Sequence, residues 1–286
     1  MRSAHYITLA AAAGLTALLY WGVNTVPPKK TGASQTPATQ GVMPSEPHNN
    51  IEAASFDSIY TAVRLQLPGH AITEIDSIEE LTRAIRDSAR MAPVFTNLAQ
   101  VWQKHKQLPV AAYYYAKAAK LENSEKKLNF AGQLFLDLIQ EAGSAGVQAW
   151  EAQQAIDCFK RSLELNPDND TAKMALAASY IEGTGETMQG VQLLLGITRE
   201  KPGNIPANLM LGRLSIQSGQ FDKAIQRFET VMKQEPENTE ALYFLAEAYK
   251  NKGDKEKAIE LFEKCKRIVN KPEFSKDIDQ YINSFK

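Results

Sequence analysis

The chain has 286 residues, of which 44% are hydrophobic and 23% are charged, and its formal net charge is -1. This is the composition of an ordinary globular protein, not of a disordered chain that is poor in apolar residues and rich in one sign of charge. Lys and Arg are interleaved with Asp and Glu, which argues against a nucleic-acid-binding protein, because such proteins gather their basic residues into a patch.

Residues 6–26 carry no charged side chain. As a helix this stretch would rise about 31 Å, close to the thickness of the hydrocarbon core of a bilayer. No small-residue cleavage site follows it, so we expect a transmembrane signal anchor after a short tail of residues 1–5, with a cleaved signal peptide as the alternative. Arg2 precedes the span while Lys29 and Lys30 follow it, so the positive-inside rule does not decide the orientation.

Residues 27–50 contain five prolines and almost no large apolar side chain. A segment of this composition buries too little apolar surface to offset the entropy lost on ordering. We therefore expect a flexible linker between the membrane span and the folded domain.

Two helices are predicted in residues 51–91. Apolar residues from Phe56 to Leu67 form one stripe that ends at Pro68-Gly69, and a second helix is expected to open at a capping box formed by Ser77 and Glu80. The pair is interpreted as an N-terminal helical cap, which a stack of repeats needs at its end. An element for self-association beside the membrane is the alternative.

A repeated pattern occupies residues 92–272, in blocks of about 92–124, 125–169, 170–204, 205–238 and 239–272. The last two blocks have the same period of 34 residues, as Leu211-Gly212 and Leu245-Ala246 show. Small and large apolar residues recur at fixed offsets, so that a small residue admits a neighbouring helix and a large one fills the space between units. The residues expected to make this packing are Ala99, Trp102, Gly132, Phe135, Ala155, Phe159, Tyr180, Gly212, Ala224, Phe228, Ala246, Tyr249, Ala258 and Phe262.

The spacing Leu242-x2-Leu245-Ala246-x2-Tyr249, followed by Ala258-x3-Phe262, resembles the tetratricopeptide-repeat (TPR) family. The resemblance implies an all-α, right-handed superhelical solenoid of about five helix-turn-helix repeats that binds other proteins. Residues 273–286 are expected to form a C-terminal capping helix with Phe274, Ile278, Tyr281, Ile282 and Phe285 on one face.

The block at 125–169 is longer than the others. Gly132 and Ala155 are 23 positions apart, whereas the matching Gly212 and Ala224 are 12 apart. We expect the 11 extra residues to extend the first helix and the turn around residues 141–146. A harmless longer turn and a functional insertion are both open interpretations.

Cys158 and Cys265 lie in the second helices of different repeats. Because each repeat of a solenoid contacts only its neighbours, the two residues should be too far apart for a disulfide bond. We expect both to be buried, free cysteines that say nothing about the redox compartment.

The sequence shows no catalytic motif and no metal-ligand spacing. Gly183, Gly185 and Gly190 lack both the spacing and the preceding strand of a dinucleotide-binding loop. We therefore expect neither an enzyme nor a cofactor, metal or nucleic-acid site.

In TPR proteins the first helix of each repeat lines a concave groove, so the resemblance implies binding residues on that face. Residues at the matching offsets are Gln100, Gln133, Met174, Leu209, Arg213, Ile216, Tyr243, Glu247 and Lys250, with Leu209, Arg213, Tyr243 and Glu247 as the main expected contacts. The early positions are mostly Gln and Thr and not the Lys, Arg and Asn residues of the family's clamp for C-terminal carboxylates. This departure argues against that type of co-chaperone.

The pattern favours a non-catalytic, membrane-anchored adaptor that binds a protein or peptide partner through this groove, with a membrane complex as one candidate partner. A holdase or accessory factor for protein export, envelope assembly or cytochrome maturation is the alternative, and a self-assembling structural element is a third. Resemblance to bacterial envelope TPR proteins implies an inner-membrane anchor with the repeats in the periplasm. The cytoplasmic face, or secretion after signal cleavage, stays open, as does the oligomeric state.

Overall fold

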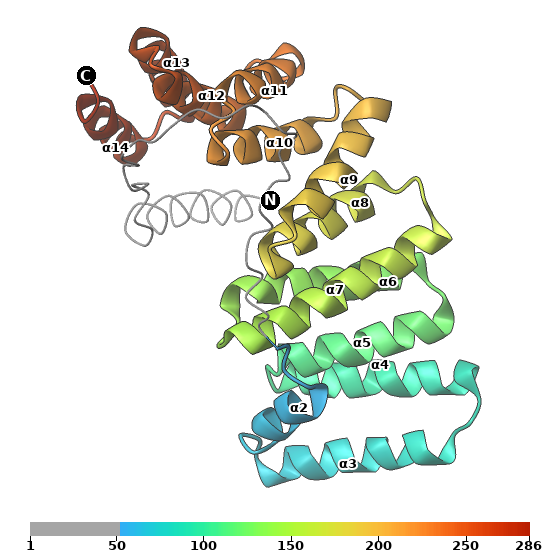
Figure 1. Cartoon of the computed structure of the whole chain (residues 1–286). Helices are drawn as coiled ribbons and strands as arrows, with labels where there is room; N and C mark the ends of the chain where they lie inside the picture. Colours follow the sequence, from blue (N-terminus) through green and yellow to red (C-terminus); the bar gives the residue numbers. More distant parts are fainter. Residues whose placement is uncertain (1–51) are drawn as a thin grey trace, which may run out of the picture. The chain divides into compact units, whose positions relative to one another are not determined.

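The computed structural model describes residues 52–286, a region built of helices without any β-strand (Figure 1). The predicted tail, membrane span and linker lie outside the described residues. Within residues 52–286 no helix combines the length and apolar character needed to cross a bilayer. The helices are α2 (Phe56–Arg64), α3 (Gly69–Ala84), α4 (Ser88–Lys104), α5 (Leu108–Glu122), α6 (Glu125–Leu138), α7 (Ala145–Leu165), α8 (Asp170–Ala178), α9 (Thr187–Glu200), α10 (Ile205–Gln217), α11 (Phe221–Gln234), α12 (Thr239–Lys252), α13 (Lys255–Val269) and α14 (Pro272–Asn283).

Helices α4 to α13 form five consecutive pairs, and every helix packs against the next one along the chain. The first helices of neighbouring pairs also touch, as α6 touches α8 and α10 touches α12, and the second helices α5 and α7 do so as well. Each pair therefore buries its apolar faces against its neighbours, as in a repeat solenoid. This confirms the predicted all-α repeat fold.

Glycine and asparagine occupy left-handed backbone positions in several turns between helices. Gly219 and Gly253 have φ angles of +72° and +99°, in the left-handed region that favours glycine. Asn123 ends α5 with φ of +48°. Asparagine tolerates this conformation better than most residues, so it can end the helix in place of glycine.

The repeat packing depends on close approach between a small residue and an aromatic ring. A Cβ atom added to Gly212 would lie 2.5 Å from a ring carbon of Phe228, and one added to Gly132 would lie 2.9 Å from the ring of Phe159. Both distances are shorter than van der Waals contact, so the second helix of each repeat reaches its partner only because no side chain stands in the way.

The N-terminal helices differ from the prediction. α3 begins at Gly69, next to Pro68, and Ser77 lies in its interior with its hydroxyl donating to the carbonyl oxygen of Thr73 at 2.8 Å. The predicted capping box at Ser77 and Glu80 is therefore wrong. Proline and glycine, interpreted as the end of the first helix, also mark the start of the second, because proline holds the extended backbone that precedes a helix.

The extra residues of the second repeat lengthen its second helix and not its first. α6 has 14 residues whereas α7 has 21, and a single turn of 3-10 helix (Ile139–Glu141) joins them. Helix α7 begins this early because Ser144 accepts a hydrogen bond from the backbone N–H of Val147 at 3.3 Å and so caps it. Trp150 lies in the added part of α7. In the first turn of the same helix, the carbonyl oxygen of Gly146 accepts a hydrogen bond from the backbone N–H of Ala54 at 2.8 Å. The insertion thus fastens the segment that precedes α2.

The third repeat accommodates its extra residue as a π-helical turn, Ser179–Thr184, at the end of α8. Gly185 then ends the turn with φ of +72°. At the other end of the described chain, α14 buries Ile278 and Ile282 in a cluster with Phe262. Cys158 and Cys265 are buried and free, as predicted.

Candidate functional site

The predicted binding face is formed by the solvent-directed residues of the first helices, α4, α6, α8, α10 and α12, and is called here the first-helix face. Gln100 and Gln133 are exposed, whereas Met174, Arg213, Ile216, Tyr243, Glu247 and Lys250 are partly buried. The residues assigned to repeat packing behave differently. All of them are buried: Ala99, Trp102, Gly132, Phe135, Ala155, Phe159, Tyr180, Gly212, Ala224, Phe228, Ala246, Tyr249, Ala258 and Phe262. The packing residues of both helices of each repeat are therefore buried, whereas most of the predicted binding residues keep some exposure to solvent.

Arg213 joins two neighbouring first helices. Its Nη1 lies 2.9 Å from Oε1 of Glu240, and its guanidinium lies 6.0 Å from the ring centre of Phe244. Because both partners of the ion pair are about two-fifths exposed, the pair contributes little to stability. It does place one positive and one negative group side by side on the face.

Glu247 and Lys250 form the end of the face nearest α14. The Nζ of Lys250 lies 3.1 Å from Oε2 of Glu247, also donates to the hydroxyl of Tyr281, and lies 4.5 Å from the centre of the Tyr281 ring. Tyr281 belongs to α14, so the C-terminal helix already contacts this part of the face. A ligand would find Arg213 more accessible than Lys250.

Leu209 and Tyr243 are less available than the sequence suggested. Leu209 is only 9% exposed and belongs to the C-terminal core, which excludes it as a main contact. The ring of Tyr243 packs edge-on against Phe262, with ring centres 5.4 Å apart. Burial raises the pKa of Tyr243 above its ordinary value, and the carboxylate of Glu247 raises it further.

An aromatic residue that the sequence analysis passed over lies on the first-helix face. Phe130 is 49% exposed and stands one helical turn before Gln133 on α6. Its ring packs edge-on against Tyr115 at 5.4 Å, and the hydroxyl of Tyr115 donates to Oε1 of Gln103 on α4 at 2.7 Å. The first two repeats together therefore present the exposed ring of Phe130 together with the amides of Gln103 and Gln133.

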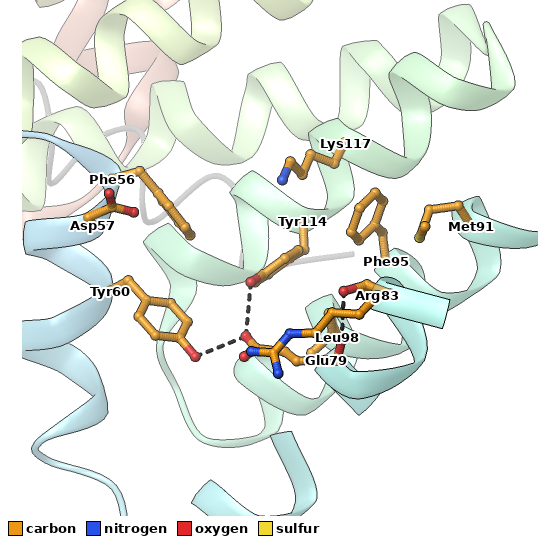
Figure 2. A pocket seen from close by; sticks show the side chains of 11 residues that line it. Phe56, Asp57, Tyr60, Glu79, Arg83, Met91, Phe95, Leu98, Tyr114 and Lys117 are labelled. Atoms are coloured by element: carbon orange, nitrogen blue, oxygen red, sulfur yellow. Dashed lines mark hydrogen bonds between the residues drawn. The ribbon is translucent and has the colours of Figure 1, made fainter. Parts of the chain in front are cut away.

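A pocket of about 390 Å³ lies between the N-terminal helices and the first repeat (Figure 2). α2 contributes Phe56, Asp57 and Tyr60, and α3 contributes Glu79, Thr82 and Arg83. From the first repeat come Met91, Phe95 and Leu98 on α4, with Tyr114 and Lys117 on α5. Its volume is within the range of small-ligand sites.

Aromatic rings make the wall of this pocket on the α2 side. Phe56 stacks on Tyr113 with ring centres 3.7 Å apart and meets Tyr114 edge-on at 6.1 Å. Tyr60 meets the buried Trp102 edge-on at 5.3 Å. α2 is therefore held against the first repeat mainly by aromatic contacts.

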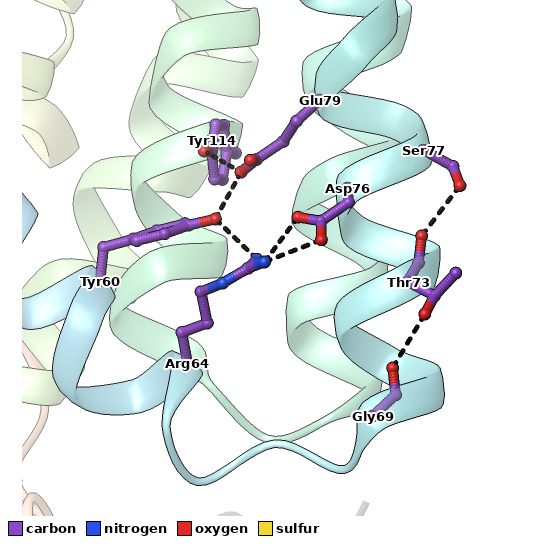
Figure 3. A network of polar contacts seen from close by, with 8 residues as sticks. All are labelled: Tyr60, Arg64, Gly69, Thr73, Asp76, Ser77, Glu79 and Tyr114. Carbon is purple, nitrogen blue, oxygen red and sulfur yellow. Dashed lines mark hydrogen bonds and ion pairs between the residues drawn. The ribbon is translucent and has the colours of Figure 1, made fainter.

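A chain of polar contacts fixes the tyrosines (Figure 3). The hydroxyls of Tyr60 and Tyr114 both donate to Oε1 of Glu79, at 2.9 and 3.1 Å. The guanidinium of Arg64 donates to both carboxylate oxygens of Asp76 and to the Tyr60 hydroxyl. Burial, followed by the bond to Glu79, raises the pKa of Tyr60 to about 12, so both phenols keep the protons that they donate.

The sequence offered one signal for this pocket. Tyr113, Tyr114 and Tyr115 are consecutive on one helix, and three successive residues of a helix point in different directions. They cannot all face one neighbouring helix, so some other element must cover at least one of them. In the structure Phe56 of α2 covers Tyr113, while Tyr115 turns toward α6.

No group of His, Cys, Asp and Glu side chains within residues 52–286 is arranged to hold a metal ion. Glu151 on α7 carries a buried carboxyl, with only 1% of the residue exposed. Its surroundings favour the neutral form, because burial raises its pKa to about 7 and the carboxylate of Glu141 adds to this effect.

A family model and a curated protein both match part of this chain. The family model described as tetratricopeptide repeat matches residues 215–274. The anaphase-promoting complex subunit 3 of Dictyostelium discoideum is 31% identical over 80 residues, which are 28% of this chain and only 8% of that protein's length.

Among solved structures, the crystal structure of MamA protein superposes with a TM-score of 0.51 at 19% identity and covers 64% of this chain and 93% of the MamA chain. MamA 41-end from Desulfovibrio magneticus RS-1 gives a TM-score of 0.50 at 20% identity, with 63% and 95% covered. At these identities the likeness concerns the fold. The resemblance of the chain to the tetratricopeptide-repeat family is thus supported by the family model over residues 215–274 and by the shared helical-repeat fold over a larger part of the described chain.

Proposed function

We propose that the chain is a non-catalytic scaffold that binds a protein or peptide partner on the first-helix face. The observation that carries the proposal is the exposed aromatic side chain of Phe130 on α6, which has the amide of Gln133 one turn away and Tyr115, bonded to the amide of Gln103, beside its ring. An aromatic group that is half open to solvent and flanked by hydrogen-bonding side chains is typical of a binding surface.

The charged pair further along the face supports the same proposal. Arg213 and Glu240 bridge α10 and α12 while both remain partly open to solvent. Amides at one end and opposite charges at the other give a partner a direction in which to bind, because reversing the partner would mismatch its polar groups.

Substitution of Phe130 tests directly whether a partner binds on the first-helix face. We expect Phe130→Ala to reduce capture of the cellular partner at least fivefold and to change the melting temperature little, because half of the side chain is already exposed. Capture is measured by affinity purification of the full-length chain from its own cells, with quantification of the enriched protein. Met188→Ala is the matched control, since Met188 is 68% exposed on α9, a second helix. Equal capture by both variants would contradict the proposal.

We also propose that residues 6–26 anchor the protein in a membrane and that the repeats occupy the periplasmic side. The uncharged stretch, long enough to span a bilayer, supports the first part, and resemblance to envelope TPR proteins supports the second. The anchored chain is expected to stay in the membrane pellet after washing at alkaline pH and to be digested by protease added to spheroplasts. Release into the wash would contradict the anchor, and protection in intact spheroplasts would contradict the orientation.

A further inference from the structure

The pocket between α2, α3 and the first repeat is built in a way that suits a ligand. Its two tyrosines are held by the carboxylate of Glu79, and its apolar floor includes Phe95 and Leu98. A site whose walls are already fixed loses little conformational entropy when it is filled. The pocket volume of about 390 Å³ accommodates one large side chain and the backbone beside it.

Lys117 and Arg83 give the rim of this pocket a positive character. The Nζ of Lys117 lies 5.1 Å from the ring centre of Phe95 and 5.0 Å from that of Tyr113. Arg83 is exposed. Within residues 52–286 neither side chain lies within ion-pair distance of a carboxylate.

Arg86, in the connection from α3 to α4, and Arg90, in the first turn of α4, are exposed but do not line the pocket. Asp87 between them caps α4 by accepting from the backbone N–H of Ala89 at 2.9 Å. Two carboxylates also lie at the pocket, but Glu79 already accepts two phenol hydroxyls and Asp57 stands on the α2 side. Neutral phenol donors leave the negative charge of Glu79 in place, so the pocket lining holds two carboxylates and two cations. The positive charge is confined to the part of the rim where Arg83 and Lys117 stand, and there it favours acidic groups in a ligand.

We propose that this pocket is a second binding site, separate from the first-helix face, and that it takes a segment of a partner protein with one large apolar side chain flanked by carboxylates. The apolar side chain enters among Phe56, Phe95 and Tyr114. The flanking carboxylates pair with Lys117 and Arg83. Because the two cations stand on different helices, a segment with acidic residues on both sides of its anchor satisfies both.

A panel of labelled pentapeptides tests the proposal. The central residue is Trp, Leu or Ala, the flanks are either Asp and Glu or Lys, and binding to the full-length chain in mild detergent is followed by fluorescence anisotropy at low ionic strength. The acidic Trp and Leu peptides are expected to bind at least tenfold more tightly than the acidic Ala peptide or any Lys-flanked peptide. No binding, or equal binding of acidic and basic peptides, would overturn the proposal.

Variants that remove the positive charges of the pocket rim provide a second test of the proposal. Arg83→Gln combined with Lys117→Gln is expected to weaken the acidic Trp peptide about tenfold, since each partly exposed ion pair contributes up to about fivefold. The matched control combines Lys120→Gln with Arg199→Gln, which removes the same charge from exposed positions outside the pocket. If the two double variants lose the same affinity, the effect is one of net charge and the pocket is not the site.

Methionine methyl groups locate the bound peptide. Met91 lines the pocket, whereas Met174 and Met210 belong to the first helices of the third and fourth repeats. With ¹³C-methyl methionine, the acidic Trp peptide is expected to shift the signal of Met91 and to leave those of Met174 and Met210 in place. Shifts of Met174 or Met210 without Met91 would place the peptide on the first-helix face, which overturns this inference while supporting the proposed function.

Discussion

Phe228→Ala is expected to lower the free energy of unfolding of the C-terminal repeats by about 3–5 kcal/mol. The side chain is fully buried, its ring fills the space left by the missing side chain of Gly212, and it stacks on Phe244 with ring centres 5.9 Å apart. Truncation removes both contacts and leaves a cavity between two repeats. Neighbouring helices cannot close it without losing their own packing.

Urea unfolding followed by circular dichroism measures this loss, and hydrogen exchange over α10 to α14 shows where it occurs. A repeat stack can unfold in parts, so the exchange measurement separates local from global opening. Gln226→Ala is the control, because Gln226 is exposed on the same helix and its loss should change stability by no more than about 0.5 kcal/mol. A Phe228→Ala effect as small as that of the control would mean that the two repeats are not packed as described.

Glu151→Gln is expected to make the protein more stable at pH 8 and to flatten the dependence of stability on pH. The Glu151 carboxyl is 1% exposed, and its Oε2 atom has no hydrogen-bond donor within residues 52–286. Burial raises its pKa from 4.5 to about 7, with the Glu141 carboxylate adding to the shift. Ionising this group in the folded protein is therefore unfavourable.

The direction of this pH effect on stability follows from whether Glu151 binds a proton in the folded and in the unfolded state. Between pH 4.5 and 7 the unfolded chain has lost the proton of Glu151 while the folded chain keeps it, so the free energy of unfolding falls as the pH rises through this range. Above pH 7 both states are ionised at this position and the loss, about 3 kcal/mol, is complete. Glutamine stays neutral and avoids the loss.

Thermal unfolding of the two proteins from pH 4 to pH 8 provides the measurement. The curves should meet near pH 4 and separate steadily until about pH 7. Glu164→Gln is the control, because the Glu164 side chain is 61% exposed and pairs with Arg161 at the surface of the same helix. Parallel curves for wild type and Glu151→Gln would contradict the raised pKa.

Repeat spacing predicted the parts of the fold that follow from local geometry. The contact of Gly212 with Phe228 follows from a period that places equivalent residues in equivalent environments. Helix starts outside the regular repeats were harder to predict. Ser77 matched a capping pattern, but no sequence rule shows whether a serine lies at a helix start or inside a longer helix, where its hydroxyl bonds to the preceding turn.

The candidate sites were predicted only in part. The offsets located the first-helix face, but they could not show that Leu209 turns into the core or that α14 reaches Lys250, because both depend on how α14 and the last repeats pack. The N-terminal pocket could not be predicted from periodicity at all. It depends on α2, which lies outside the repeats and contacts Tyr113 across more than fifty residues of chain.

The central claim is that a partner binds on the first-helix face, and site-specific photocrosslinking in the native cell tests it most directly. A photoreactive residue at Gln133 or Arg213 is expected to capture one discrete partner, whereas the same residue at the exposed Lys255 on α13 captures none. The product from Gln133 should disappear with Phe130→Ala. A smear of many proteins would favour a holdase in place of an adaptor, and equal products from Lys255 and from both face positions would contradict the claim.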